Sequence, residues 1–222
     1  QERRGQRDAA HDAGRDDGFR CDRPGVLTRR QLVGLASATT VVTWSGAALA
    51  DRSVAEEYQL PTPGSDIDTG GAIIGINRPL AEVLKTVQRF ERYKDILPRC
   101  EESRVAAKQD DGSTDVYVRA PIMGGVASIW GVLRVSPVKP WHKRGKRIDA
   151  ALVKGNVHAF HGSWKALECG PKRCVLRLEW FIDVKVPVPA WVVTRELRWA
   201  AGKGVTAVRD MTECGHSTVA GD

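Results

Sequence analysis

Few residues of this chain have the types and spacing that acid–base catalysis requires. His161, Lys165 and Asp149 are the candidate proton donors or acceptors for chemistry in a pocket. Each alternates with apolar neighbours along a predicted strand, so we expect all three side chains to face solvent. Residues 51–222 contain no glycine-rich phosphate loop, no Gly-x-Ser-x-Gly elbow, no metal-ligand cluster and no close carboxylate pair. We therefore assign no catalytic residue, and an enzyme is the second of our hypotheses.

Four cysteines follow residue 50, an even number that is typical of disulfides in an exported protein. Cys169 and Cys174 flank Gly-Pro-Lys-Arg, a turn-forming tetrapeptide, and we predict that these two residues pair. Cys100 and Cys214 would then form the second disulfide by elimination. The alternative is four buried free thiols, because the connectivity of disulfides does not follow from sequence.

Cysteine and histidine together could also bind zinc. His158 and His161 are near Cys169 and Cys174 in the sequence, and these are the usual zinc ligands. The two histidines are three residues apart on a predicted strand, so they point to opposite faces. We expect neither a metal ion nor another cofactor.

Paired arginines precede an uncharged stretch early in the chain. Thr28, Arg29 and Arg30 are followed by uncharged residues as far as Ala48-Leu49-Ala50, the layout of a secretory signal with a small-x-small cleavage site. The Thr-Arg-Arg-Gln-Leu-Val run resembles the twin-arginine export motif, with Leu where Phe is commoner. Hydroxyls and glycine dilute the stretch, which makes an uncleaved membrane anchor the lesser alternative. We predict cleavage after Ala50 and an exported protein, periplasmic or secreted.

The predicted signal divides the chain into four parts. Residues 1–50 form a leader with the signal peptide, 51–70 an extended lead, 71–214 one domain and 215–222 a tail. The first 25 residues are rich in Arg, Asp and Gly with almost no large apolar side chains, which predicts disorder. Because the sequence begins with Gln, we expect this end to be trimmed or its translation start to be assigned too early. Residues 51–222 are enough for one domain with a sizeable core.

The positive charge of the chain is too mild to indicate a nucleic-acid partner. The net charge is +7; residues 1–50 carry 8 Lys+Arg and 6 Asp+Glu, so residues 51–222 keep 26 and 21, or +5. Nucleic-acid binding would need a basic face with aromatic stacking platforms. The one dense basic run, Lys139–Arg147, surrounds Trp141 and could touch an anionic membrane transiently; a solvated turn is the alternative. We expect a monomer.

Alternation of apolar and polar residues predicts a sheet with one buried face. In the segment from Leu176 to Val184 every second side chain is apolar and charged residues lie between them. Such a sheet needs a cover, which the closing helix can supply. The predicted strands are Ala72–Asn77, Cys100–Ala107, Thr114–Ile122, Val126–Val135, Arg147–Val153, His158–Glu168 and Cys174–Val186, with helical segments at 79–87 and 90–96 and a long helix at Ala190–Met211.

This order of elements resembles the helix-grip fold of START-like proteins, the SRPBCC superfamily, which includes coenzyme Q-binding proteins and polyketide cyclases. The resemblance covers about Gly71 to Met211. It rests on Phe90-Glu-Arg-Tyr93 running into Leu97-Pro98, on Phe160, Gly162 and Trp164 alternating along one strand, and on the strand from Cys174 to Phe181. It implies an α+β fold in which a curved antiparallel sheet of six to seven strands wraps round a long C-terminal helix.

The resemblance also implies a cavity between sheet and helix that holds a lipid, sterol, quinone or polyketide. The predicted function is therefore the binding or transfer of a hydrophobic small molecule. A cyclase or aromatase-like enzyme using the same cavity is one alternative, and a protein-interaction domain with a filled core is another.

The register of the last predicted hairpin decides which side chains face this cavity. If Cys169 pairs with Cys174, His161 and Lys165 face inward. If the residue before Cys169 pairs with Cys174, Phe160 and Trp164 face inward instead. A one-residue slip moves a whole strand to the other face, and burying two aromatic rings is favoured over burying a lysine and a histidine. We predict the second register.

The predicted cavity lining consists of apolar side chains from the strands and the closing helix. Trp130 is ambiguous, because its neighbours Ile129 and Leu133 compete with it for the inner face. Gly202 and Gly204 in the closing helix have three alternative explanations. They form a flexible segment that admits the ligand, they allow close packing on the sheet, or they mark a break between two helices. The predicted ligand-binding residues are Val118, Ala120, Ile129, Leu133, Leu152, Phe160, Trp164, Leu178, Trp180, Ile182, Trp191 and Leu197.

Overall fold

The computed structural model describes residues 53–122, 125 and 127–214. The predicted signal, with Arg29, Arg30, Ala48 and Ala50, and the predicted tail lie outside these residues. Within the described part of the chain, no helix is both long enough and apolar enough to span a membrane.

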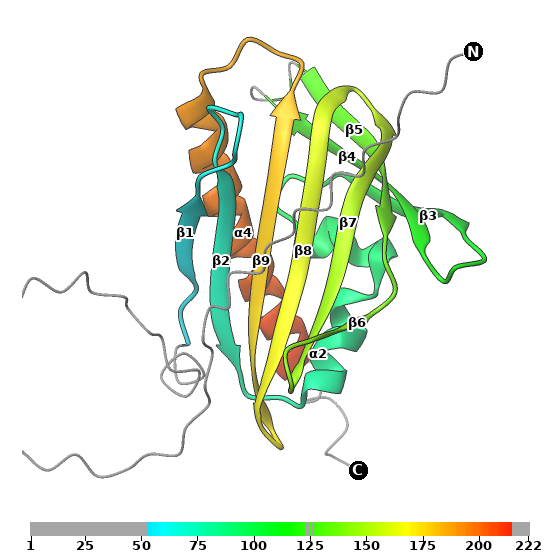
Figure 1. The fold of residues 1–222 in the computed structure, drawn as a ribbon, viewed down its shortest axis with the longest axis vertical. Helices are drawn as coiled ribbons and strands as arrows, with labels where there is room; N and C mark the ends of the chain where they lie inside the picture. The colour runs from blue at the N-terminus through cyan, green and yellow to red at the C-terminus, as the bar shows by residue number, and fades with distance from the viewer. Residues whose placement is uncertain (1–52, 123–124, 126, 215–222) are drawn as a thin grey trace, which may run out of the picture.

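Nine strands of the described residues form one curved antiparallel sheet, shown in Figure 1. The strand order is β1-β2-β9-β8-β7-β5-β4-β3, and the short strand β6 pairs with β7. The two ends of this order do not pair with each other, so the sheet is open. The bounds are β1 Glu56–Leu60, β2 Thr69–Ile76, β3 Glu102–Lys108, β4 Thr114–Ile122, β5 Ala127–Val135, β6 Lys139–Trp141, β7 Gly145–Gly155, β8 Val157–Gly170 and β9 Arg173–Val184.

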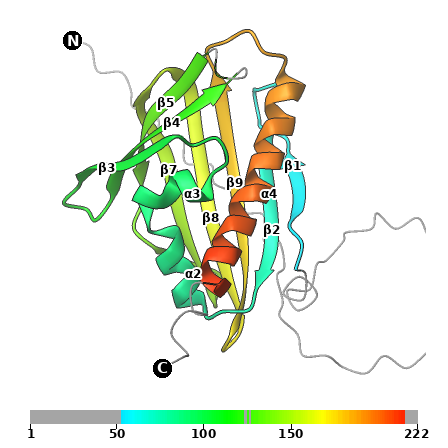
Figure 2. The ribbon, with the colours of Figure 1, turned by 180° about the vertical axis from the view of Figure 1, so that it is seen from behind.

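One long helix, α4 at Ala190–Cys214, covers the concave face of the sheet, as Figure 2 shows. The shorter helices α2 (Leu80–Val87), η1 (Phe90–Arg92) and α3 (Tyr93–Ile96) connect β2 to β3 on the same face. Ile74, Leu176 and Val205 are almost completely buried between these layers. Apolar burial on this face supplies the main driving force for folding.

Gly70 allows α4 to approach the sheet closely. A Cβ atom at this position of β2 would lie 2.5 Å from the Cβ atom of Leu197, a distance that real side chains do not tolerate. Glycine is therefore required where strand and helix cross.

The predicted fold class is confirmed, but the sheet has more strands than the six or seven expected. β1 and β6 were not predicted. Three of the five residues of β1 are Glu or Gln, and β6 is three residues long with a proline in its centre, so neither shows a usable alternation. The predicted extended lead thus contains an edge strand that pairs with β2.

The predicted register of the last hairpin is confirmed. Glu168 lies opposite Cys174, and Trp164 lies opposite Leu178. A register shift between Glu168 and Gly170 accommodates the extra residue, Cys169. This pairing turns Phe160 and Trp164 toward the concave face.

The glycines of α4 are explained by close packing. The helix is continuous from Ala190 to Cys214, and both Gly202 and Gly204 are buried. A Cβ atom at Gly202 would lie 2.5 Å from the Glu57 carboxylate, and one at Gly204 would lie 3.2 Å from a methyl group of Leu178. Of the three predicted explanations, the break between two helices is therefore wrong.

Candidate ligand cavity

An apolar cavity lies between the concave face of the sheet and the helices α3 and α4. Its volume is about 190 Å³. β4, β5, β7, β8 and β9 each contribute side chains at alternate positions, as the pleat requires. On β8 these residues are Phe160, Gly162 and Trp164, and on β9 they are Leu178, Trp180 and Ile182. The cavity is thus a direct result of the hydrophobic alternation in the sequence.

The cavity is long and narrow. Val116 and Ile122, six residues apart on β4, both line it, which corresponds to a length of roughly 20 Å at the rise of a β-strand. An apolar cavity of about 150 Å³ accepts benzene, whereas pockets for drug-sized ligands measure roughly 300–1,000 Å³. In this conformation the space therefore suits a two-ring molecule or a segment of an alkyl chain.

Eleven of the twelve predicted ligand-binding residues line this cavity. The exception is Trp191, in the first turn of α4, which is 66% exposed. Its predicted place in the cavity is wrong, because this turn presents the indole to solvent. The structure also settles which side Trp130 faces. Its side chain is 38% exposed, stacks on Tyr117 with ring centroids 6.2 Å apart, and only borders the cavity.

Several polar residues of the cavity were not predicted. Tyr93 is 7% exposed and contributes its ring from the start of α3. Arg99 follows α3 with a φ of 62° and forms an ion pair of 3.1 Å with Glu196 of α4. The side chains of this pair are 51% and 45% exposed, which places the pair at the solvent side of the cavity. Only the Phe90–Tyr93 motif pointed to this region, and a motif does not tell which atoms face a ligand.

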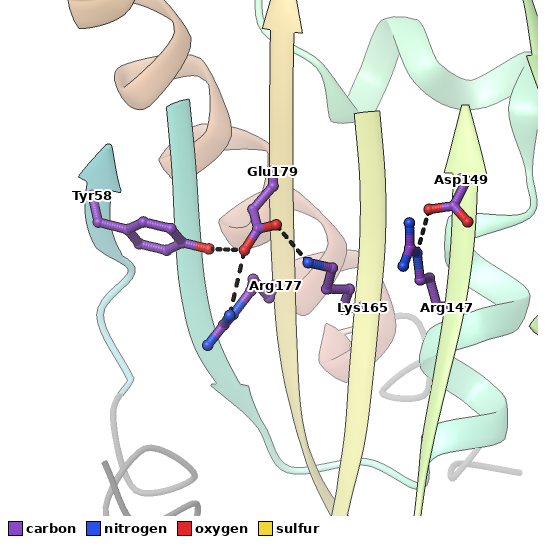
Figure 3. A network of polar contacts seen from close by, with 6 residues as sticks. All are labelled: Tyr58, Arg147, Asp149, Lys165, Arg177 and Glu179. Carbon is purple, nitrogen blue, oxygen red and sulfur yellow. Dashed lines mark hydrogen bonds and ion pairs between the residues drawn. The ribbon is translucent and has the colours of Figure 1, made fainter. Parts of the chain in front are cut away.

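The three acid–base candidates lie on the convex face, away from the cavity. His161 stacks on Phe181, Lys165 forms an ion pair of 2.6 Å with Glu179, and Asp149 accepts a hydrogen bond from Arg147. Figure 3 shows Lys165 and Asp149 within this network on neighbouring strands. The outward placement predicted from the alternation is therefore confirmed.

Glu179 is the centre of the convex network. It accepts a hydrogen bond of 2.8 Å from the Tyr58 hydroxyl, and Arg177 and Lys165 approach its two oxygens (Figure 3). Tyr58 reaches across Gly71, where a Cβ atom would collide with its ring at 2.5 Å. Burial by itself would raise the pKa of Glu179, but the charge and hydrogen bond of Lys165, with Tyr58 and Arg177, lower it overall. The carboxylate is therefore ionised at neutral pH.

Cys100, Cys169, Cys174 and Cys214 form no disulfide in the structure, so neither predicted disulfide is seen. Cys174 packs in the core of the concave face, whereas Cys169 packs beside Val175 on the opposite side of the hairpin. Burial raises the pKa of Cys174 to about 12 and that of Cys100 to about 11, which keeps both thiols protonated and unreactive.

Cys100 and Cys214 are too far apart to pair. Arg99, beside Cys100, contacts Glu196, and Cys214 lies 18 residues further along the same helix. At the helical rise this separation is about 27 Å, and a disulfide requires Cα atoms within about 7 Å. Among the described residues, no group of three or more His, Cys, Asp or Glu could hold a metal ion.

The basic hairpin between β6 and β7 is partly packed against the sheet. Trp141 is half-buried, and the Lys165 ammonium lies 5.8 Å from the centre of its ring. His142, Lys143 and Arg144 at the turn are exposed. Arg144 forms an ion pair of 3.7 Å with Glu168, and Lys143 beside it is exposed, so these side chains face solvent more than the indole does.

Comparison with known proteins gives one family and a set of similar folds. The model of the family described as polyketide cyclase / dehydrase and lipid transport matches residues 76–209, more than half of the chain. A comparison with curated proteins gives no match.

The similar folds include START domains. A STAR-related lipid transfer protein from Xanthomonas axonopodis has a TM-score of 0.63 and 12% identity, over 72% of this chain and 93% of that one. A START superfamily protein from Mycobacterium smegmatis has a TM-score of 0.55 and 19% identity, over 66% and 97%. The lipid transfer and protein localization domain of human StarD13 has a TM-score of 0.59 and 17% identity, over 71% and 83%. At these identities the likeness concerns the fold. Together with the family match, it shows that the chain belongs to the polyketide cyclase/dehydrase and lipid transport family, within the START-like (SRPBCC) superfamily.

Proposed function

We propose that this protein binds and carries a hydrophobic small molecule in the cavity between its sheet and α4. The main supporting observation is the apolar lining that five strands direct into one partly open space. Burial of a ligand's apolar surface there would supply the binding free energy, at about 25 cal/mol per Å² before the costs of association. A lipid, sterol, quinone or polyketide-like molecule has the required surface. The lipid-transfer names of its structural neighbours agree with this proposal.

Carrier function is favoured over cyclase function by the placement of titratable groups. Chemistry in the cavity would need a proton donor or acceptor that reaches the bound molecule. His161, Lys165 and Asp149 face the other side of the sheet, and the Glu196 carboxylate is paired with Arg99. The described lining therefore offers binding surface rather than an acid–base pair.

The cavity is tested by two substitutions of neighbouring alanines on β7. Ala150 lines the cavity, and Ala151 is exposed on the convex face. We expect the wild type to bind 2-ethylnaphthalene in equilibrium dialysis, at one molecule per chain. Ala150→Phe should reduce the affinity at least tenfold, because the new ring occupies the cavity, and Ala151→Phe should leave it unchanged. Equal loss in both variants, or no binding by the wild type, would contradict the proposal.

The second part of the proposal is that the protein is exported before it binds or delivers its ligand. It rests on Arg29, Arg30 and the cleavage site at Ala48–Ala50. The expected mature N-terminus is Asp51. Arg29→Lys with Arg30→Lys should retain the protein inside the cell if the twin-arginine route is used, while a wild-type N-terminus upstream of Asp51 in the exported fraction would refute cleavage there.

The carrier is proposed to act as a monomer that touches anionic membranes transiently through the β6–β7 turn. The exposed cations Lys143 and Arg144 support this contact electrostatically, at about 1 kcal/mol per charge near the surface. Co-sedimentation with vesicles containing 30% anionic lipid should therefore weaken in Lys143→Glu/Arg144→Glu and at high salt. Undiminished co-sedimentation would argue against this surface.

A further inference from the structure

We infer that Tyr93 is the hydrogen-bonding anchor of the cavity and that the ligand is uncharged, with one acceptor such as a carbonyl oxygen at its buried end. This inference rests on the proposed function and deepens it. The Tyr93 side chain is deeply buried in the lining, and within the described residues its hydroxyl donates no hydrogen bond to a protein oxygen.

Tyr93 is held in a fixed position. It is the first residue of α3, is 7% exposed and lines the cavity together with Trp164. Phe90 contacts its ring edge to face, with centroids 5.8 Å apart and an angle of 80° between the planes. The backbone N–H of Leu97 donates to its carbonyl oxygen at 2.7 Å, which fixes the helical turn. A rigid donor of this kind imposes orientation on a ligand at low entropic cost.

The hydrogen bonding of the hydroxyl leaves a donor available. The indole of Trp164 interacts with Tyr93. An indole N–H can only donate, so it cannot take up the phenol hydrogen, and this hydrogen can still be given to a ligand. Burial raises the pKa of Tyr93, which keeps this hydrogen in place at physiological pH.

Two other polar groups of the described lining are engaged. The indole N–H of Trp180 donates to the Leu197 carbonyl at 2.8 Å. The Cys100 thiol donates to the carbonyl oxygen of Glu102. The Ser163 hydroxyl is buried and has no hydrogen-bond partner among the described residues, but the alternation along β8 turns it toward the convex row, where its cross-strand neighbours are Asp149 and Glu179.

Charge on the ligand is excluded at this depth. The described cations of the lining, Arg99 and Arg119, have side chains 51% and 46% exposed and form ion pairs with Glu196 and Glu101. An anion beside Tyr93 would lose its hydration without gaining a counter-charge, at a cost that one neutral donor does not recover. A ketone, ester, quinone or amide oxygen has no such cost.

The test compares two probes of the same shape, 2-acetylnaphthalene and 2-ethylnaphthalene, which differ in one carbonyl group. The ratio of the ketone's affinity to the hydrocarbon's, measured by equilibrium dialysis, includes the cost of desolvating the carbonyl, so the change of this ratio between variants reports the hydrogen bond. A hydrogen bond is worth about 0.5–1.5 kcal/mol net, so Tyr93→Phe should lower the ratio roughly three- to tenfold and retain the affinity for 2-ethylnaphthalene. Tyr117→Phe, which removes a hydroxyl from the convex face, should keep the wild-type preference.

The outcomes separate this inference from the proposed function. An affinity ratio that is the same in wild type and in Tyr93→Phe would overturn the anchor but leave the carrier proposal intact. Failure of wild type to bind either probe would overturn the carrier proposal itself. Circular dichroism melts of Tyr93→Phe should show a folded protein, because the substitution keeps the ring.

Discussion

The indole N–H of Trp180 donates a hydrogen bond of 2.8 Å to the carbonyl oxygen of Leu197, in the buried contact between β9 and α4. Both residues also line the cavity. The bond joins sheet and helix beside the space they enclose, so the stability of the fold and the shape of the cavity depend on the same contact.

Trp180→Phe should lower the free energy of unfolding by about 1–3 kcal/mol. The substitution removes a buried donor, leaves the Leu197 carbonyl with one partner fewer and opens a small void. Urea denaturation measures the difference. Trp191→Phe is the matched control and should change stability by less than about 0.5 kcal/mol, because Trp191 is exposed. Equal effects of the two substitutions would contradict the role of the Trp180 bond.

Gly70→Ala and Gly202→Ala should shift stability in opposite directions. At Gly70 the new methyl group meets Leu197 and the helix backbone, so we expect a loss of about 2–3 kcal/mol. At Gly202 it meets Oε1, Cγ and Cδ of Glu57, but this exposed side chain can rotate away, and the helix gains roughly 0.5–1 kcal/mol. Thermal unfolding of both variants checks this prediction. A destabilising effect of Gly202→Ala would show that the Glu57 side chain cannot move aside and would contradict this prediction.

Glu179 should make stability depend on acid pH. Its pKa is lowered in the folded protein, so its contribution is fully present above the ordinary value of 4.5 and is lost as the pH falls through the lower folded value. Glu179→Gln should cost about 1–3 kcal/mol at pH 7, and the difference from wild type should shrink below about pH 4.5. Denaturation series at several pH values, with the exposed Glu101→Gln as control, measure both effects. A difference that stays constant to low pH would refute the ionised network.

The cysteines should contribute nothing through disulfides. Reductant should leave the unfolding free energy of the purified protein unchanged, because Cys169 and Cys174 pack on opposite sides of their hairpin and Cys100 and Cys214 are far apart. Peptide mapping under non-reducing conditions identifies any cross-link. Recovery of a Cys169–Cys174 peptide, together with a stability loss on reduction, would contradict the packing of that hairpin.

Much of the sheet could be predicted because burial acts on alternate residues. The choice of register at Trp164 and Cys174 needed only the rule that two aromatic rings outcompete a lysine and a histidine for the interior, and it was confirmed. Alternation also placed the ten predicted cavity residues that lie on strands. The placement of Trp191 was wrong, because a single aromatic residue in the first turn of a helix does not show which side of the helix packs against the sheet.

The unpredicted features depend on contacts between distant segments. The Tyr58–Glu179 hydrogen bond joins residues 121 positions apart. It crosses Gly71, and no pattern in the sequence marks this glycine. The Arg99–Glu196 pair and the burial of Tyr93 arise from where α3 meets α4 and the sheet. The predicted disulfides are not seen in the structure, and an even count of cysteines carries no information on which face of a hairpin each thiol occupies.

Native mass spectrometry of the protein purified from its own cells, followed by solvent extraction, tests the central claim most directly. The account predicts one small hydrophobic molecule per chain, uncharged and containing a carbonyl or similar acceptor, released by the solvent and absent from an Ala150→Phe sample prepared in parallel. A wild-type protein that carries no such mass, or an Ala150→Phe variant that carries the same mass at the same stoichiometry, would contradict a ligand in this cavity.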